Sequence, residues 1–503
     1  MQLTRSAKRP FAAATQAGSI SRRPARLRGS VVAAASMLGV VVFAGCSTPV
    51  LAPSVPVPEQ FSAASSSVAE PEVAWWDSFD DPALSALIQR AAFENRDIKI
   101  AVERVRSARA VHTISRSAML PNLGFVAGVH NQSTGFDDAV KQGMPDVDTN
   151  SAGVGVSWEI DLSGRLRAGV AAAAADANAA EDSARGVRLL VLTDVASNYF
   201  TLVGALRQLD TVRAISQAQD ETLRLVTARQ RVGLASPFDV ERARTEAERA
   251  RAALPPLETL AAVSRHRIAV LIGDQAANAS AIVPSDRDLA VPEVRPGQPA
   301  TLLERRPDLL AYKAQLDAAN ARRRQARAEW FPRLFVGALF GRQSLESNDV
   351  DLGAARFSNA AAVLAAPIFD WGRTRSINEI AENNQKEALY RYEDAIVRAL
   401  EDVENALVSL NDERERGDSL QRAAASADSA LARAQALYDR GQIDLLPLLD
   451  AQRQRLLVRT GANDSQTQLR LGAVQLYKAL GGGWEAFGPV DAPVAAKTAA
   501  TSN

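Results

Sequence analysis

Hydrophobic and polar residues alternate along residues 151–160, which read SAGVGVSWEI. One face of this stretch is apolar, and it carries Ala152, Val154, Val156, Trp158 and Ile160. A period of two indicates a β-strand, and an apolar face opposite a small or polar one is typical of a transmembrane barrel strand. The same pattern predicts strands over 121–132, 332–343 and 356–368. The apolar positions in the last two are Leu334, Val336, Ala338, Phe340, Ala360, Ala362, Leu364 and Ile368.

Two polar stretches, 133–150 and 343–355, separate the predicted strands. We expect them to be long loops, as the extracellular loops of outer-membrane barrels are. Soluble hairpins with one buried face would show the same alternation, so the pattern alone leaves that alternative open.

A helical period runs from Gly164 to Val232, a stretch without proline. Its apolar residues recur every 3.5 positions or so, the spacing of a coiled coil. At 1.5 Å per residue the stretch predicts a rod of roughly 100 Å. The apolar positions are Val187, Val191, Val195, Tyr199, Leu202, Leu206, Leu209, Val212 and Ile215, and Val403, Leu407 and Leu410 reproduce three of them later in the chain.

The chain repeats itself. Residues 95–125 align with 306–336 without a gap at an offset of 211, and the offset becomes 208 further on. Three glycines then align with three others: Gly164 with Gly372, Gly233 with Gly441, and Gly273 with Gly481. We therefore predict a mainly α protein with a β-barrel part, built from two repeats of helix, two strands, long helix and helix.

The predicted domain organisation follows from these repeats. The first repeat is 75–283, a Pro-rich joint is 284–300, the second repeat is 301–484, and 485–503 is a flexible tail.

Each repeat has a turn after its long helix, at 232–237 and at 440–446. Gly233 can adopt the left-handed conformation that ends a helix, and Pro237 suits the first turn of the next one. Gly441 is the matching residue of the second turn. The turns are thus the ends of two helical hairpins.

Four strands are too few for a barrel in one chain. A sheet in lipid must close, because open edges leave backbone groups without partners, and small barrels use about eight strands. If the strands span a membrane, several copies of the chain must share one barrel, and periodicity does not set their number.

The N-terminal segment predicts export. Residues 1–45 contain seven basic residues, no acidic one and an apolar run at 31–44, as a signal peptide does. Cys46, the sole cysteine, follows in FAGC, which resembles the cleavage site of bacterial lipoproteins. That resemblance implies a lipid on Cys46 and, with Ser47 next, an outer-membrane destination. An unmodified Cys46 is the alternative, and 46–74 is expected to be a lipid-anchored linker.

Composition and charge argue against other classes. The chain has 58 basic and 58 acidic residues, and without residues 1–45 it is net acidic, unlike a nucleic-acid binder. No cluster predicts a catalytic or metal site, because His112, His130 and His266 are isolated along the chain. We expect no enzyme activity and no cofactor.

Four stretches together resemble the outer-membrane efflux proteins, the TolC-like family, in its lipoprotein branch. They are WWDSFDDPALSALIQRAAFENRDIKIA (75–101), LLERRPDLLAYKAQLDAANARRRQARAEWFPRL (302–334), RVGLASPFDV (231–240) and YDRGQIDLLPLLDAQR (438–453). The resemblance implies a homotrimer with a twelve-stranded barrel in the outer membrane and an α-helical barrel across the periplasm. It also implies a periplasmic adaptor and an inner-membrane pump of the resistance-nodulation-division type, with conduction of drugs or other small molecules as the function.

The resemblance also points to the hairpin turns. Gly233, Leu234, Gly441 and Gln442 match the turns that face the adaptor, although the glycines can equally serve only to permit the turns. The apolar LLPLL (445–449) either contacts the adaptor or packs within its own hairpin.

Charges near the second turn are candidates for a periplasmic gate. In a three-fold ring, copies of each would lie close together, and carboxylates could pair with arginines of the next copy. The candidates are Asp439, Arg440, Asp444, Arg229 and Arg231. A solvated charged tip is the alternative.

Two other functions fit parts of the pattern. The same channel could serve type I protein secretion, which nothing in these residues excludes. A lipid-anchored periplasmic scaffold without a pore would explain the helices, but it has no need of four alternating strands.

Overall fold

The computed structural model describes residues 49–62, 72–133, 135, 137, 147–285, 291–347 and 350–489. The chain divides into two compact units, Met1–Pro49 and Val50–Asn503, and the fold described below is that of the second. The signal peptide, Cys46 and nearly all of the predicted tail lie outside the described residues.

Two very long helices organise the fold, α4 (Arg165–Arg231) and α9 (Arg373–Asp439), each of 67 residues. Glycine in the left-handed conformation precedes both, Gly164 and Gly372. The shorter helices are α2 (Pro82–Glu94), α3 (Arg96–Ser117), α5 (Pro237–Ala252), α6 (Leu254–Leu271), α7 (Leu302–Arg305), α8 (Pro307–Ala328) and α10 (Leu445–Leu480). Short 3-10 helices are η1 (Trp75–Phe79), η3 (Ala276–Ala281), η4 (Pro299–Thr301) and η5 (Trp484–Phe487).

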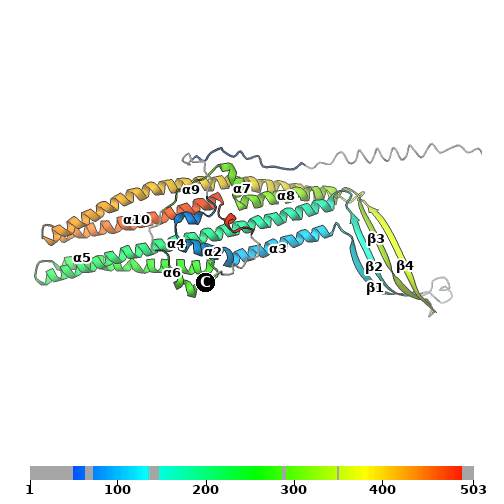
Figure 1. Cartoon of the computed structure of the whole chain (residues 1–503), viewed down its shortest axis with the longest axis horizontal. Helices are drawn as coiled ribbons and strands as arrows, with labels where there is room; N and C mark the ends of the chain where they lie inside the picture. The colour runs from blue at the N-terminus through cyan, green and yellow to red at the C-terminus, as the bar shows by residue number, and fades with distance from the viewer. Residues whose placement is uncertain are drawn as a thin grey trace, which may run out of the picture. The chain divides into compact units, whose positions relative to one another are not determined.

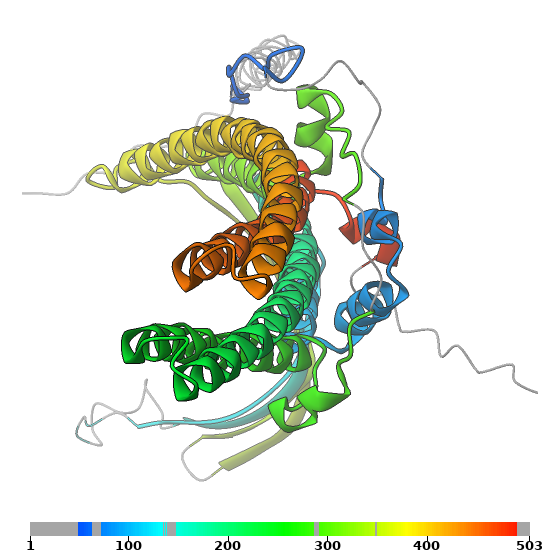
Figure 2. The same cartoon turned by 90° about the vertical axis from the view of Figure 1, so that its left-hand side faces the viewer.

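The helices lie side by side in a curved row (Figure 2). Next to the sheet, α4 packs between α3 and α8, and α8 packs against α9. Toward the hairpin turns, α4 packs between α5 and α10, and α10 packs against α9 (Figure 1). The helices α3 and α9 therefore form the two edges of the row near the sheet.

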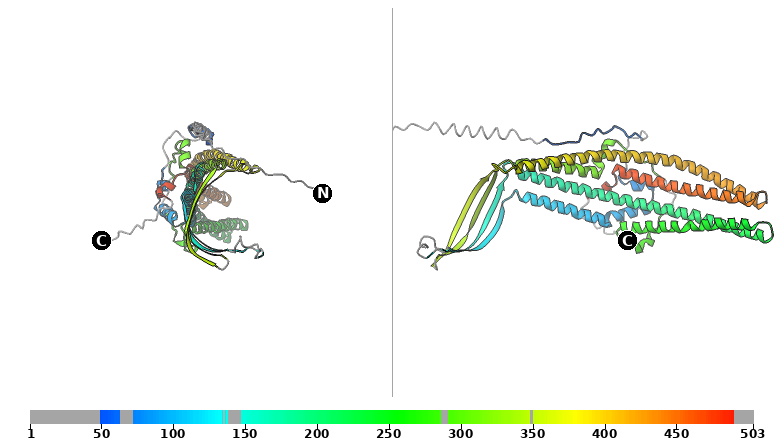
Figure 3. Two further views of the ribbon diagram at one scale, coloured as in Figure 1. Left: turned by 90° about the vertical axis from the view of Figure 1, so that its right-hand side faces the viewer. Right: turned by 180° about the vertical axis from the view of Figure 1, so that it is seen from behind.

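The four strands form one antiparallel sheet in the order β1-β2-β3-β4 (Figure 3). Their bounds are β1 (Asn122–Gln132), β2 (Val147–Ile160), β3 (Arg333–Ser347) and β4 (Val350–Ala365). Val154 lies opposite both Phe125 and Phe340, and Val156 lies opposite Leu123 and Ala338. The apolar positions predicted from the alternation thus share one face of the sheet.

The second predicted hairpin differs from the structure in two ways. The stretch 343–355, expected to be a loop, is mostly strand, because β3 continues to Ser347 and β4 begins at Val350. Backbone pairing with the neighbouring strand, as between Glu346 and Asp351, keeps these polar residues extended. Ile368 lies beyond β4, which ends at Ala365 before Pro367 removes a backbone donor.

Two glycines allow β2 and β3 to approach closely. Gly153 lies opposite Gly341 in the register. A Cβ at Gly341 would lie 2.4 Å from the carbonyl oxygen of Ala152, and one at Gly153 would lie 2.7 Å from that of Phe340. Neither position has room for a side chain.

The main core surrounds the middle of α4. Tyr199 and Phe200 are fully buried against Trp75 and Phe79 of η1, and Tyr477 of α10 stacks on Trp75 at 5.1 Å. Tyr199 donates a hydrogen bond to Asp81, and it accepts one of 3.1 Å from the backbone N–H of Ser285. Burial and the bond to Asp81 raise the pKa of Tyr199.

The apolar residues that repeat with the coiled-coil spacing pack into this core. Most of the predicted apolar positions of α4 are buried, and Val403, Leu407 and Leu410 are buried in α9. An apolar window of α4 is long enough to cross a membrane, but 61% of it is buried by the rest of the protein. We interpret α4 as a core helix.

Candidate functional site

The two hairpin turns have the same backbone geometry. Gly233 and Gly441 are left-handed, with φ of 74° and 68°. The N–H of Leu234 donates to the carbonyl of Arg229 at 2.9 Å, and the N–H of Gln442 donates to that of Leu437 at 2.9 Å. Together with the glycine N–H bonds three residues back, these are Schellman motifs, so both glycines have a structural role in ending their helices.

The first turn presents an apolar surface. Val232, Leu234 and Phe238 are 70%, 76% and 67% exposed. Ser236 and Asp239 form a capping box that fixes the start of α5 immediately beside them. The turn is therefore rigidly held while its large side chains stay exposed, and of these Phe238 has the guanidinium of Arg242 over its ring at 5.4 Å.

The second turn is polar, and the apolar residues that follow it are largely internal. Leu445, Leu448 and Leu449 are buried, whereas Leu446 is half exposed. The buried three form a cluster with Val226 of α4 and Val240 of α5. The segment 445–449 therefore packs mainly between the two hairpins, and Gln442 lies exposed at the turn.

The gate candidates are at the surface of this tip. Asp439 and Arg440 end α9, and Asp444 is the N-cap residue of α10, where its charge favours the helix start. Asp439 accepts a hydrogen bond of 3.0 Å from Gln435. Within the described part of one chain, none of these three forms an ion pair with Arg229 or Arg231.

Arg229 has a different partner, which the sequence analysis missed. Its guanidinium lies 4.4 Å from the ring centroid of Tyr438, and Tyr438 is only 4% exposed. This cation–π contact joins α4 to α9 next to both turns. A lone aromatic three residues before the turn glycine was the available signal in the sequence.

Polar contacts connect the two hairpins along α4 and α10. The hydroxyl of Thr211 accepts from Asn463 at 2.8 Å, and that of Thr222 accepts from the buried Gln452 at 3.0 Å. Farther toward the core, Gly204 lies against Thr467. The hairpins are held together here by specific hydrogen bonds in addition to apolar packing.

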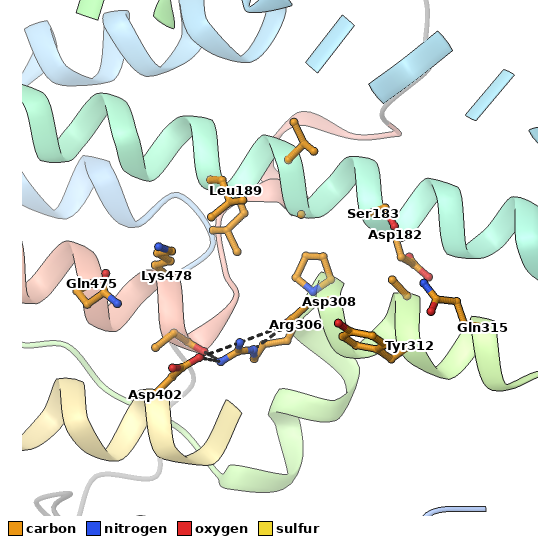
Figure 4. Close-up of a pocket in the computed structure, with 16 residues that line it drawn as sticks. Asp182, Ser183, Leu189, Arg306, Asp308, Tyr312, Gln315, Asp402, Gln475 and Lys478 are labelled. Atoms are coloured by element: carbon orange, nitrogen blue, oxygen red, sulfur yellow. Dashed lines mark hydrogen bonds and ion pairs between the residues drawn. The ribbon is translucent and has the colours of Figure 1, made fainter. Parts of the chain in front are cut away.

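The second repeat has an ionic joint where α10 ends and α8 begins (Figure 4). The guanidinium of Arg306 donates to the carbonyl of Ala479 at 3.1 Å and to the carboxylates of Asp308 and Asp402 at 2.8 and 3.0 Å. Burial alone would lower the pKa of Arg306, but the bonds to Asp308 and Asp402 raise it. A cavity of about 450 Å³ lies beside this joint between α4, α8 and α10.

The first repeat makes the corresponding joint with an amide. Asn95, which aligns with Arg306, donates to the carbonyl of Leu271 at 2.8 Å. Gly273 follows α6 and lies against Glu94, the neighbour of Asn95, and Gly481 follows α10 and lies against Arg306. A Cβ at these glycines would meet backbone atoms at 2.6 and 2.8 Å. The helix stacks of the two repeats are therefore built alike.

The described residues do not form a cluster of metal ligands. No group of three or more His, Cys, Asp or Glu side chains in them could hold a metal ion. His112, His130 and His266 lie separately on α3, β1 and α6.

Comparison with known proteins identifies the family. A sequence model described as outer membrane efflux protein matches residues 87–274 and 299–482. The chain belongs to the outer membrane efflux protein family. Outer membrane protein OprJ of Pseudomonas aeruginosa is 32% identical over 86% of this chain and 91% of OprJ. The probable outer membrane lipoprotein SilC of Salmonella typhimurium is 27% identical over 89% of this chain and 98% of SilC. The solved outer-membrane channel OprN superposes with a TM-score of 0.80 and 28% identity, covering 87% of this chain and 99% of OprN.

Membership of the outer membrane efflux protein family confirms the resemblance read from the sequence. The chain is an efflux channel protein of the outer membrane. Its mainly helical fold with a small antiparallel sheet is that of the solved TolC-like channels.

Proposed function

We propose that three copies of this chain assemble into one duct, with a twelve-stranded barrel in the outer membrane and a helical barrel in the periplasm. The row of helices and the sheet together form a curved wall. The observation that carries the proposal is that this wall has two open edges. β1 and β4 are each paired on one side only, so three copies of a four-stranded sheet would close as twelve strands.

Exposed apolar side chains on the edge helices support the same arrangement. On α3 they are Ile100, Val111 and Ile114, and on α9 they are Ile380, Tyr390 and Val397. Water-exposed stripes of this kind are costly in a monomer and are typical of interfaces. Contact between α3 of one copy and α9 of the next would bury both.

The apolar face of the sheet suits contact with lipid, because every backbone group of a closed barrel is paired and only side chains meet the membrane. A lipid on Cys46 would add an anchor. A segment that follows it in the chain is bound to α9. The N–H and hydroxyl groups of Ser54 donate to Glu393, and those of Ser62 donate to Glu404. Through these hydrogen bonds, a lipid anchor on Cys46 would hold α9 at a fixed distance from the membrane.

The function is conduction without catalysis, driven by an inner-membrane pump of the resistance-nodulation-division type. Several charges on α9 are paired along the helix, including Glu387 with Arg391 and Asp394 with Arg398. Paired charges give a polar wall with little net field, which suits passage of varied drugs and other small molecules. Substrate choice then belongs to the pump.

The hairpin tips would meet a periplasmic adaptor. The exposed Leu234 beside Val232 and Phe238 gives an apolar contact of the kind that anchors an interface, and Gly233, Gly441 and Gln442 shape the two turns. Asp439, Arg440 and Asp444, with Arg229 and Arg231, would form the resting gate when three copies bring them together.

The test is photo-crosslinking in cells from Leu234 and Gln442, each replaced by a photoreactive amino acid, with Lys313 on the exposed side of α8 as the control position. Capture of the adaptor of a small-molecule efflux pump from the tips, and not from Lys313, is expected. Capture of a protein-secretion adaptor would keep the channel and change its cargo to that of type I secretion. Absence of any periplasmic partner, or a purified protein without conductance in planar bilayers, would contradict the proposal in favour of a scaffold.

A further inference from the structure

We propose that the cavity beside the Arg306 joint binds small zwitterionic molecules, with the ammonium group of Lys478 holding their carboxylate and the carboxylate of Asp182 holding their ammonium group. The inference deepens the proposed function and rests on it, because the cavity lies on the side of the helical row that would face the duct. Its volume of about 450 Å³ falls within the range of about 300–1,000 Å³ that is usual for small-molecule sites.

The cavity lies on the concave side of the row of helices. Gly186 and Leu190 of α4 line it. Arg188 is two residues from each of them, which is about 200° round the helix. Its guanidinium lies 5.8 Å from the ring centroid of Phe487 in η5, and η5 lies on the convex side of the row (Figure 2). The cavity therefore faces the inside of the curve, where the duct would be.

The charges of the Arg306 joint are paired with one another. Arg306 bonds to Asp308 at 2.8 Å and to Asp402 at 3.0 Å. Two charged groups of the cavity lining stand outside this joint, the ammonium group of Lys478 on α10 and the carboxylate of Asp182 on α4. They are opposite in sign and come from different helices, so together they match a ligand with one charge of each sign.

Lys478 supplies the positive charge. It is partly buried in the last turn of α10, and its ammonium group has no carboxylate partner within the described residues. A cation is favourable at the C-terminal end of a helix, but that interaction leaves the three N–H donors of the ammonium group available. A ligand carboxylate could therefore accept from Lys478.

Asp182 supplies the negative charge. It is 9% exposed, and in the part of the chain that the structure describes only its Oδ1 accepts a hydrogen bond, from Arg185 at 2.7 Å. Burial raises the pKa of Asp182, and Arg185 opposes this shift. A buried carboxylate oxygen without a donor is costly, so an ammonium group that donates to it would be bound favourably.

Apolar side chains lie between the two charged groups. Figure 4 shows Leu189 between Lys478 and Asp182, and Tyr312 also lines the cavity. Leu190, another lining residue, is 49% exposed. A ligand with an aromatic body could pack on these side chains while its two charged ends reach Lys478 and Asp182.

The first repeat builds the corresponding joint without these groups. Val270 aligns with Lys478, and Ala101 aligns with Tyr312. Neither the ammonium group nor the aromatic ring is thus required for stacking helices in this way. A binding role accounts for their presence at the second joint.

The site is tested with 4′-(aminomethyl)biphenyl-4-carboxylate, whose two rings separate an ammonium group from a carboxylate. Isothermal titration calorimetry of the full-length protein in detergent, against detergent alone, is expected to show saturable binding. The methyl ester lacks the carboxylate, and the N-acetyl derivative lacks the ammonium group. Each is expected to bind at least about tenfold more weakly, because it leaves one charged group of the cavity without a partner.

Substitutions test the two residues. Lys478→Gln and Asp182→Asn are each expected to weaken binding of the zwitterion at least about tenfold. Lys313→Gln, on the exposed side of α8, and Asp210→Asn, which pairs with an arginine three residues on as Asp182 does, remove the same charges elsewhere and are expected to leave binding unchanged. Lys478→Val carries the residue of the first repeat and serves as a second test if Asp182→Asn does not fold.

The outcomes separate this inference from the function on which it rests. Equal binding of the zwitterion and either derivative, or equal losses in the cavity variants and their controls, would overturn the site. Absence of saturable binding to a protein that conducts in planar bilayers would overturn the site and keep the channel. Charge-dependent binding to a protein that does not conduct would support the site and contradict the proposed duct.

Discussion

A single missing side chain sets the distance between the two hairpins. Gly204 of α4 lies against Thr467 of α10, and a Cβ at this glycine would lie 2.3 Å from the hydroxyl of Thr467 and 3.1 Å from its Cβ. The Cβ of Thr467 is bonded to the backbone of α10, so a change of side-chain rotamer cannot move it out of the way. The helices therefore approach here because position 204 has no side chain.

Gly204→Ala is expected to lower the free energy of unfolding by about 1–3 kcal/mol, the usual cost of overpacking. Gly186→Ala on the same helix is the control, because its nearest neighbour, Pro307, would be an ordinary 3.7 Å away. That control is expected to stabilise by about 0.5–1 kcal/mol through helix propensity. Denaturant titration of the detergent-solubilised protein measures both, and equal effects would contradict the close approach.

At the scale of elements, end-to-end stacking of helices makes one wall out of two repeats. The end of α6 meets the start of α3, where Asn95 donates to the carbonyl of Leu271, and the end of α10 meets the start of α8, where Arg306 donates to the carbonyl of Ala479. Only Arg306 also reaches α9, through Asp402. The sequence alignment placed Arg306 opposite Asn95, but nothing in the sequence indicated that the guanidinium would join three helices.

Arg306→Met is expected to destabilise the protein by about 1–3 kcal/mol, because it removes charge-assisted bonds and leaves the carbonyl of Ala479 with one donor fewer. Asp308 and Asp402 are about half exposed, so water limits the penalty of leaving them unpaired. Arg398→Met breaks only the exposed pair with Asp394 and is expected to change stability by less than about 0.5 kcal/mol. Thermal unfolding followed by circular dichroism compares the two, and similar midpoints would refute the role of Arg306.

At the scale of the whole molecule, one chain is an incomplete wall. Its strands have free edges, its edge helices expose apolar side chains, and its tip charges lack ionic partners within the described chain. Each of these features is explained if identical copies close a ring. The resting gate proposed above would then be a property of the assembly, because it would depend on distances between copies.

Asp439→Ala combined with Asp444→Ala is expected to increase resting conductance in planar bilayers. Loss of about 1 kcal/mol from the closed state would raise the open fraction about fivefold. Asp412→Ala with Asp418→Ala removes the same charge from α9 away from the tip and is expected to leave conductance unchanged. An unaltered resting conductance in the tip variant would place the gate elsewhere.

The sequence by itself determined the features that depend on local period and turn chemistry. The alternation along β2, the 3.5-residue spacing along α4, and the left-handed glycines at 233 and 441 are each contained in a short stretch of chain. The aligned repeats likewise predicted the order of helices and strands, and the four motif stretches indicated the family.

Only the tertiary structure decided where distant segments meet. Most of the polar stretch 343–355 is strand because a neighbouring backbone offers hydrogen-bond partners, which no local pattern records. Arg229 stacks on Tyr438, more than 200 positions away, and Arg306 meets Asp402, because the folded helices bring them together. Side-chain contacts of this range depend on packing geometry, and packing exists only once the chain has folded.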